Sequence, residues 1–475
     1  MASVKIDRFG GIAPRQHPTQ LADGMATKAH NVRLKTGKLV PLKEPKLVSG
    51  VALLKENGLT DIAEAKSIHA WKKQDGSVEF LLFPGITWMA EGNVADDERT
   101  RVVISGETGV GENECEPCVY MRENGVRTIH RLVKEALPVL HVTRTSEVAL
   151  DDNRRYTRFF ATWVDKYGYE SPVNAPSKIL DASNNVWVDG DLEYLDGDNV
   201  SWKFAEDADA DIKSAAKKIR IYKVVTGTDE GRIQFVKESV VTNDIWDPSA
   251  GGGAVQVKDE DVGEVMPEIE APMADLGCIH DVPGGFYVGF AESNPKTVCF
   301  SDVNLLYSWP VAYRYDVKDN LVALAVTSNT VFALTDGWPY VLSGTAPESM
   351  TVAKLAGPAA CVSPRGVCVY KNAVYYVSNA GLMTIYNSAD AGTVCANLTD
   401  KIFTKEQWAA LNPASCTMGQ FDGALVLFFT LPGGARKALT IDLLEDATLA
   451  VTTHDEVAAC LCVDNKTDKL YYVRG

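Results

Sequence analysis

The sequence predicts an all-β protein: a β-propeller of about seven blades, closed by an N-terminal hairpin, with an inserted Ig/fibronectin-like β-sandwich domain. Three observations predict this fold. Short runs of β-branched and aromatic residues recur, polar turns separate them at intervals of about 40–50 residues, and one long gap interrupts the series. With 475 residues, 46% of them hydrophobic, the chain can bury a large core.

Strand-like patterns dominate the chain. Residues 367–370, 374–377 and 425–429 are rich in valine, leucine, tyrosine and phenylalanine, and they are bounded by Asn, Asp and Gly. Helical patterns are few. One helix is predicted over 406–411, between Thr404 and Pro413, and a second over 208–218.

Polar turns between strand pairs give the repeat. Their centres are placed at Asp75, Asn124, Gly284, Asn329, Asn372, Asp422 and Asn465. Neighbouring centres are 43–50 residues apart, except that 160 residues separate Asn124 from Gly284. This period is typical of propeller blades with four strands each. The alternative is an array of β-sandwiches whose spacing is accidental.

The long gap predicts an inserted domain over residues 138–268, between propeller segments 1–137 and 269–475. Residues 156–164 alternate like a strand, and 218–225 with 232–236 resemble a hairpin around 227–231. Six or seven short strands in this stretch are typical of a small sandwich.

The charge of the chain is −16, which argues against a protein that wraps nucleic acid by neutralising phosphates. Acids crowd residues 181–211, whereas the first fifty residues hold nine Lys or Arg against three acids. We expect the acids to face a lumen or solvent and to bind no metal; a solvated acidic loop is the alternative. The candidate lumen acids are Asp189, Asp191, Glu193, Asp196, Asp198, Asp207, Asp209 and Asp211.

Motifs for catalysis or cofactor binding are weak. The pair Cys115/Cys118 has no second pair or spaced histidines for zinc, and residues 106–111 lack the Gly-Lys-Ser/Thr of a phosphate loop. Residues 196–199 lack the ligand spacing of an EF-hand. We therefore expect no catalytic residue, no cofactor and no metal.

The beginning of the chain has no apolar core after its charges, and the longest apolar run is 457–463. These features predict neither a secretory signal nor a membrane span, so we expect synthesis in a cytoplasm and reduced cysteines.

The N-terminus is expected to close the propeller. Residues 31–35 and 38–42 alternate apolar and basic side chains around a turn, and only two strands of the last blade are evident, at 457–463 and 469–473. We therefore predict that 30–42 pairs with 469–473. The candidate closure residues are Val32, Leu34, Leu39, Tyr471 and Tyr472.

Several passages occur in an order that resembles a known family. They are 9–15, 21–24, 29–39, 158–172, 261–267, 308–313, 337–341 and 403–408. Together they resemble the tail nozzle, or head-to-tail stabilisation, proteins of short-tailed bacteriophages. Such proteins often continue past the last hairpin, so the chain is expected to be a shorter member.

The resemblance implies a structural part of the virion tail without catalysis. Several copies, expected to be six, would form a ring around the DNA channel below the portal and adaptor. The ring would retain DNA and pass it during ejection, with DNA as non-specific cargo. Two rivals stay open: a receptor-binding or adhesin protein of the virion, and a propeller enzyme that acts on glycans.

Overall fold

The computed structural model describes residues 8–92, 97–111, 114–225, 232–328, 330–357, 359–388, 392–443 and 449–474. Within these residues the chain is nearly all β, which confirms the expected class. The described ranges contain three short α-helices: Ala210–Ala215 (α1), Asn243–Trp246 (α2) and Lys405–Ala409 (α3). No helix in these ranges is long and apolar enough to span a membrane.

The chain divides into two compact units. The second comprises Leu132–Pro272 with Tyr307–Val311, and the first comprises all the rest. The inserted domain expected over 138–268 thus lies inside the second unit. The short segment Tyr307–Val311 joins it through Trp309, whose backbone N–H donates to the Glu270 carbonyl at 2.7 Å.

Seven sheets follow one another along the first unit. The first sheet contains β6 (Ser67–Lys72), β7 (Val78–Phe83) and β5 (Leu53–Lys55), and the second contains β8 (Thr87–Glu91), β9 (Val102–Gly106), β10 (Cys118–Glu123) and β11 (Val126–Arg131). The third sheet contains β22 (Leu276–Val282), β23 (Phe286–Ala291), β24 (Asn294–Phe300) and β25 (Arg314–Asp316). The fourth sheet contains β26 (Leu321–Thr327), β27 (Thr330–Thr335), β28 (Tyr340–Ser343) and β29 (Thr351–Lys354). The fifth sheet contains β30 (Val367–Tyr370), β31 (Ala373–Ser378), β32 (Gly381–Ser388) and β33 (Gly392–Asn397). The sixth sheet contains β34 (Thr417–Phe421), β35 (Ala424–Thr430), β36 (Arg436–Leu443) and β37 (Leu449–His454). The seventh sheet contains β38 (Ala458–Asp464) and β39 (Lys469–Arg474).

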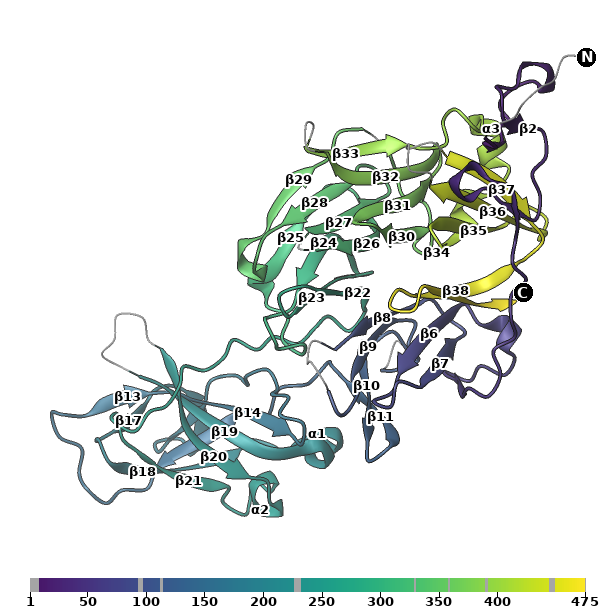
Figure 1. Cartoon of the computed structure of the whole chain (residues 1–475). Helices are drawn as coiled ribbons and strands as arrows, with labels where there is room; N and C mark the ends of the chain where they lie inside the picture. The colour runs from purple at the N-terminus through teal and green to yellow at the C-terminus, as the bar shows by residue number, and fades with distance from the viewer. Residues whose placement is uncertain are drawn as a thin grey trace, which may run out of the picture. The chain divides into compact units, whose positions relative to one another are not determined.

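The strands named first in these sheets succeed one another around a centre (Figure 1). In this order, β6, β8, β22, β26, β30, β34 and β38 each contact the next, and β38 contacts β6 again. Buried side chains fill the space between neighbouring sheets: Val288 and Phe300 pack with Leu324, and Phe80 packs with Val473. Each such side chain contributes about 1.5–3 kcal/mol when fully buried.

The predicted turns mark hairpins of these sheets. Asp75, Gly284, Asn372, Asp422 and Asn465 each join the first and second strands of a sheet. Asn372 and Asp422 have positive φ values of 61° and 48°, as two-residue hairpin turns require. Asn124 instead joins the third and fourth strands, β10 and β11, so its place in the expected series is wrong. The centre expected at Asn329 lies outside the described residues.

The N-terminal strap, defined as residues 8–42, runs along the sixth sheet instead of completing the last one. Strand β1 (Gly11–Ile12) lies parallel to β37 and to β2 (Met25–Ala26), which extends that sheet to six strands. Strand β3 (Val32–Arg33) pairs, as far as the described strands go, with β4 (Val40–Pro41) alone.

The predicted closure by 30–42 on 469–473 is therefore wrong. His30 bridges Thr453 of β37, and β39 pairs with β38 alone among the described strands. The physical reason is a buried ion pair. Arg33 Nη2 lies 2.6 Å from Asp442 Oδ1 in β36, and both side chains are less than 10% exposed. This contact holds the strap on the sixth sheet.

The second unit contains two larger sheets that share one core. Its strands are β12 (Leu140–Arg144), β13 (Arg155–Thr157), β14 (Phe159–Asp165), β15 (Lys178–Asp181), β16 (Val186–Asp189), β17 (Leu192–Tyr194), β18 (Asp198–Phe204), β19 (Ala216–Val224), β20 (Ile233–Val240) and β21 (Gly253–Val257). One sheet has the order β16-β15-β12-β18-β21 and the other β14-β19-β20, with β13 and β17 as a separate pair. Trp163 and Ile219 of the smaller sheet pack with Trp202 of the larger in the buried core.

Several expected elements differ in detail. The strand expected over 156–164 is two strands, β13 and β14, which belong to different sheets. The helix expected over 208–218 is shorter, because α1 ends at Ala215 and β19 begins at Ala216. The helix expected over 406–411 is confirmed as α3, with Thr404 as its N-cap in a capping box with Gln407. The turn expected over 227–231 lies outside the described residues.

Candidate functional site

A central cavity of about 660 Å³ lies among the first strands of the seven sheets. Each of these seven first strands, or the residues directly next to it in the chain, lines the cavity. All of the lining residues belong to the first unit. Its charged lining residues are Lys66, Lys72, Glu91, Asp281, Arg365, Asp464 and Lys466. The sequence did not reveal this cavity, because its lining comes one short stretch at a time from seven distant segments.

Two ion pairs within this lining join different sheets: one links the first and seventh sheets, and the other links the seventh and second sheets. Lys72 Nζ of β6 lies 2.7 Å from Asp464 Oδ1 at the end of β38, and Lys466 Nζ lies 3.1 Å from Glu91 Oε2 of β8. Burial alone would raise the pKa of Asp464, but hydrogen bonds from Lys72 and Thr467 outweigh it and lower the pKa to about 2. Asp464 is therefore a permanent anion that neutralises Lys72.

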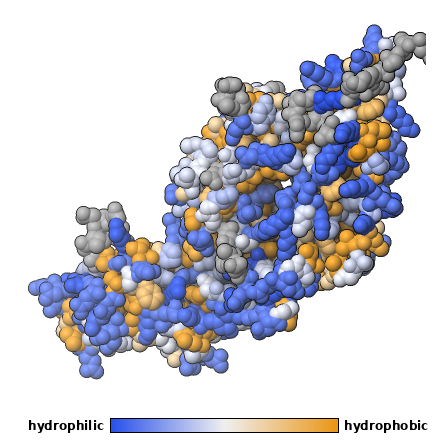
Figure 2. All heavy atoms as spheres, in the orientation of Figure 1, coloured by the Kyte–Doolittle hydropathy of each residue, from blue (hydrophilic) through white to orange (hydrophobic). Residues whose placement is uncertain are grey.

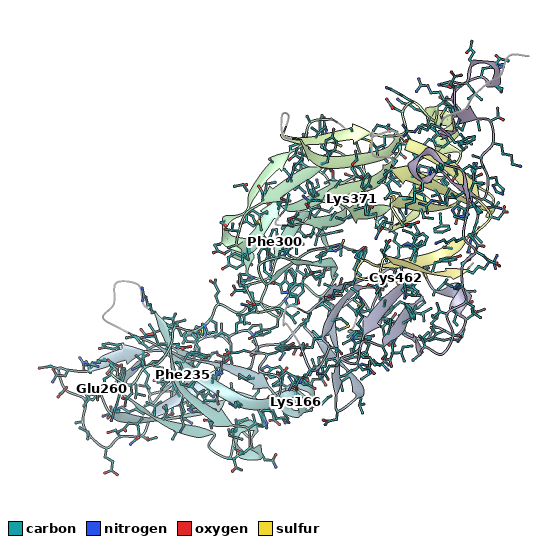
Figure 3. All side chains as sticks on the ribbon, viewed as in Figure 1. Lys166, Phe235, Glu260, Phe300, Lys371 and Cys462 are labelled. Atoms are coloured by element: carbon teal, nitrogen blue, oxygen red, sulfur yellow. The ribbon has the colours of Figure 1, made fainter. Side chains whose placement is uncertain are left out.

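The histidines and thiols of the cavity are not activated for chemistry. Burial lowers the pKa of His69 and of His280 to about 4, so both imidazoles are neutral at neutral pH. His69 Nε2 lies 2.8 Å from Thr87 Oγ1. Burial raises the pKa of two cysteines of β38, Cys460 and Cys462, to about 12, so both remain thiols; Figure 3 labels Cys462. These four side chains are therefore uncharged at neutral pH.

The eight candidate lumen acids all lie in the second unit, and none lines the cavity. Asp198 is buried and accepts a hydrogen bond from Arg144 Nε at 2.5 Å. Burial alone would raise the pKa of Asp198, but hydrogen bonds from Arg144 and from the Leu195 N–H outweigh it, so the pKa is lowered. Asp191 pairs with Arg158 at 2.6 Å, and Asp207 pairs with Lys213. Asp209 caps α1 by accepting from the Asp211 N–H.

The remaining acids are more open to solvent. Asp189 and Asp196 are exposed and lie 4.0 Å from Lys178 and 3.6 Å from Arg155, and Glu193 is half-buried on β17. The acidic block is thus partly neutralised by bases outside it. Figure 2 shows hydrophilic residues over most of the drawn face of this unit, interrupted by small hydrophobic patches. Whether these acids line a lumen stays a prediction.

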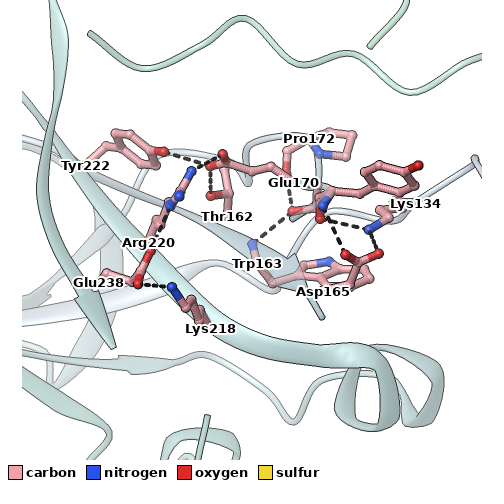
Figure 4. Close-up of polar contacts among 12 residues, drawn as sticks. Lys134, Thr162, Trp163, Asp165, Glu170, Pro172, Lys218, Arg220, Tyr222 and Glu238 are labelled. Carbon is pink, nitrogen blue, oxygen red and sulfur yellow. Dashed lines mark hydrogen bonds and ion pairs between the residues drawn. The ribbon is translucent and has the colours of Figure 1, made fainter. Parts of the chain in front are cut away.

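A buried polar network fixes the smaller sheet of the second unit (Figure 4). Glu170 is 3% exposed, and its carboxylate accepts hydrogen bonds from Thr162 Oγ1 at 2.5 Å, Tyr222 OH at 2.7 Å and Arg220 Nη1 at 2.6 Å. Arg220 also pairs with Glu238. The charged groups of the network are paired with one another, and we therefore interpret the network as structural rather than catalytic.

A second cluster surrounds Lys223, whose side chain is completely buried. Its Nζ pairs with Asp259, which also accepts from Tyr194 OH at 2.8 Å and pairs with Arg155. Burial, reinforced by Asp259, raises the pKa of the Tyr194 phenol well above its ordinary value. Lys223 and Asp259 thus form an ion pair inside the second unit.

The candidate closure residues are separated by the structure. Three of them belong to the strap: Leu34 is 1% exposed and Val32 packs on the core of the sixth sheet, whereas Leu39 is 54% exposed. Tyr471 packs edge-to-face on Phe80 of β7 with ring centroids 4.9 Å apart. Tyr472 lies beside Phe428 of β35. The last sheet is therefore covered by side chains of its two neighbours rather than by strap strands.

The three motifs found to be weak in the sequence, at 106–111, 196–199 and Cys115/Cys118, belong to the structural framework of the protein. Gly106, Gly109 and Gly111 have positive φ values of 90°, 75° and 80°, as in a tight loop. Asp198 is committed to Arg144, and Cys118 is buried with its thiol pKa raised by burial. Within the described ranges, no three His, Cys, Asp or Glu side chains gather as metal ligands.

Comparisons with known proteins give similarity to solved structures only. No family model and no curated protein matches the chain. Apo AztD from Citrobacter koseri is 12% identical with a TM-score of 0.28, covering 67% of this chain and 77% of that one. A functionally unknown protein from Desulfotomaculum acetoxidans is 7% identical with a TM-score of 0.26, covering 66% of this chain and 78% of that one. Hsv2 from Kluyvelomyces marxianus is 8% identical with a TM-score of 0.26, covering 55% and 70%. These TM-scores are too low to support an inference about function.

Proposed function

We propose that the chain is a structural protein of a short-tailed bacteriophage tail, a nozzle subunit that forms a ring around the DNA channel. The observation that carries the proposal is the ordered set of sequence passages that resembles this family from Phe9 to Trp408. In this role the protein binds the portal and adaptor and other tail proteins, retains DNA before ejection, and lets it pass afterwards.

We also propose the finer fold: a closed seven-bladed propeller with an Ig/fibronectin-like insertion. Support for the propeller comes from the circular order of contacts among the seven first strands, with β38 against β6. Support for the insertion comes from two sheets around one core with Trp163 and Trp202 inside. The closing contact would be made by packing, because no strand pairing joins the first and last sheets in the described residues.

The proposed role in DNA passage draws support from charge. The chain carries a net charge of −16, and Asp189, Asp196 and Asp211 are exposed on the second unit. A negative wall repels phosphates over about a Debye length, ~8 Å at physiological salt, so that DNA slides instead of adhering.

The test is co-sedimentation of the purified protein with a portal–adaptor complex of a short-tailed phage. We expect stoichiometric binding of several copies per portal ring, and no binding to the portal when the adaptor is absent. If the protein instead stays unbound and adheres to host cells or cleaves a polysaccharide, the adhesin or glycan-enzyme rival replaces the nozzle.

A further inference from the structure

A second pocket, of about 300 Å³, lies next to the central cavity and has an unusual charge balance. Its lining includes three cations, Lys66, Arg365 and Arg436, and one carboxylate, Glu64. They come from separate parts of the first unit: the loop before β6, the loop before β30 and the start of β36. The pocket is thus built by long-range folding and not by a local run of basic residues.

Arg365 is held in place by two backbone carbonyls. The Nη1 of Arg365 donates to the backbone carbonyl of Lys66, and it also donates to the backbone carbonyl of Ala459 at 3.5 Å. These two carbonyls hold the guanidinium between the first and seventh sheets. No carboxylate lies within ion-pair distance of Arg365 among the described residues. Burial lowers its pKa, since the charge is removed from water without a compensating anion.

The other two cations are exposed and have no ion-pair partner in the part of the chain that the structure describes. Glu64 is also exposed, at the end of η3 (Ile62–Glu64), and pairs with none of the three cations. Thr417 and Thr430 add hydroxyl groups to the lining. The hydroxyl of Ser415 is already committed, because it donates to the Asn412 and Thr430 carbonyls.

We propose that this pocket binds a small phosphate-class oxyanion, with Arg365 as the central contact and Lys66 and Arg436 at its rim. A guanidinium fixed through one nitrogen still presents Nε and Nη2 as a fork for an oxyanion. Three cations against one acid suit a dianion better than the single charge of a carboxylate. The inference does not depend on the proposed function.

Inorganic phosphate is the probe, titrated by calorimetry into the whole protein at constant ionic strength set with chloride. We expect saturable binding to the wild type. Arg365→Gln should weaken binding at least tenfold, and Lys66→Gln/Arg436→Gln should weaken it severalfold. Lys437→Gln is the matched control, because Lys437 is the exposed neighbour of Arg436 on β36 and does not line the pocket. This control should bind like the wild type.

Arg365→Gln also loses the contacts of Arg365 with two backbone carbonyls, and this variant could fail to fold for that reason. In that case the double variant Lys66→Gln/Arg436→Gln decides the outcome. The proposal is overturned if the wild type shows no saturable phosphate binding, or if the double variant binds as tightly as the wild type. Acetate that binds as tightly as phosphate at equal ionic strength would overturn the phosphate class.

Discussion

Arg33 and Asp442 show how one contact fixes the course of a segment. Arg33 Nε and Nη2 lie 2.9 and 2.6 Å from Asp442 Oδ1, and the Leu34 N–H donates to Asp442 Oδ2 at 3.0 Å. Removing one member of a buried pair leaves the other charge uncompensated, at a cost of about 3–5 kcal/mol. We therefore expect Arg33→Ala to lower the free energy of unfolding by this amount in urea denaturation.

Lys35→Ala is the control for this prediction. Lys35 pairs with Asp422 at 2.5 Å, but its side chain is 55% exposed, and exposed pairs contribute about 0–1 kcal/mol. Equal destabilisation by the two variants would contradict the account of the strap.

His454 is buried on β37, and its ring lies edge-on to Phe428. Neither ring nitrogen has a hydrogen-bond partner among the described residues. Burial lowers its pKa to about 4, below the ordinary 6.5. The unfolded chain therefore binds the proton first as pH falls. Stability from the neutral imidazole is fully present above pH 6.5 and is lost between pH 6.5 and 4, by at most about 1.4 kcal/mol per pH unit.

We expect His454→Met to flatten the fall in melting temperature between pH 6.5 and 4, as followed by circular dichroism. His17→Met is the control, since His17 is exposed in the strap, and it should leave the profile unchanged. An unchanged slope in His454→Met would show that this imidazole does not govern the acid response.

At the scale of elements, β1 depends on a close approach of two backbones. Gly11 has a φ of +83°, and a Cβ at this position would lie 2.3 Å from the Val451 carbonyl oxygen. Gly11→Ala should therefore displace β1 from β37 and destabilise the protein by more than about 1 kcal/mol. The measurement is the urea midpoint, with limited proteolysis of the strap as a second readout.

Gly50→Ala is a matched control for this prediction. Gly50 also has a positive φ, +75°, but no atom lies within 4 Å of a Cβ built there. Both variants carry the same kind of backbone strain, so their difference isolates the contact with Val451. Similar effects on the midpoint and on proteolysis would mean that β1 is not held by this approach.

Some elements were predictable because their causes are local. The turns at Asn372 and Asp422 and the cap of α3 at Thr404 follow from residues within a few positions of one another. Asn124 misled the repeat because a hairpin turn has the same sequence pattern between any two strands of a sheet. The strap was misplaced because β1 and β3 have two residues each and carry no periodicity.

The candidate sites were harder to predict than the fold. Acids that form a block along the chain are paired in space, as Asp198 is with Arg144 and Asp191 with Arg158. The cationic pocket around Arg365 combines residues more than two hundred positions apart, and no pattern along the sequence marks it. Such contacts depend on the tertiary arrangement and not on spacing.

At the scale of the whole molecule, the acids of the second unit give a testable prediction. Replacing Asp189, Asp196, Asp207 and Asp211 with lysine changes the net charge by about +8. We expect this variant to retain DNA in a gel-shift assay at low salt and to release it as salt rises. The wild type should show no retention.

The control for this prediction replaces four exposed acids of the first unit with lysine: Asp23, Glu44, Glu348 and Asp468. It has the same net charge as the first variant. If both variants retain DNA equally, total charge explains the effect and the acidic surface has no special place along the DNA path.

The central claim is that copies of this chain form a ring around a DNA channel. Negative-stain imaging of the purified protein, alone and with the portal–adaptor complex, tests it most directly. The account predicts ring-shaped particles with a central opening, expected to have six-fold symmetry, coaxial with the portal when it is present. Monomers that never assemble on the portal–adaptor complex, or trimers attached at another place, would contradict it.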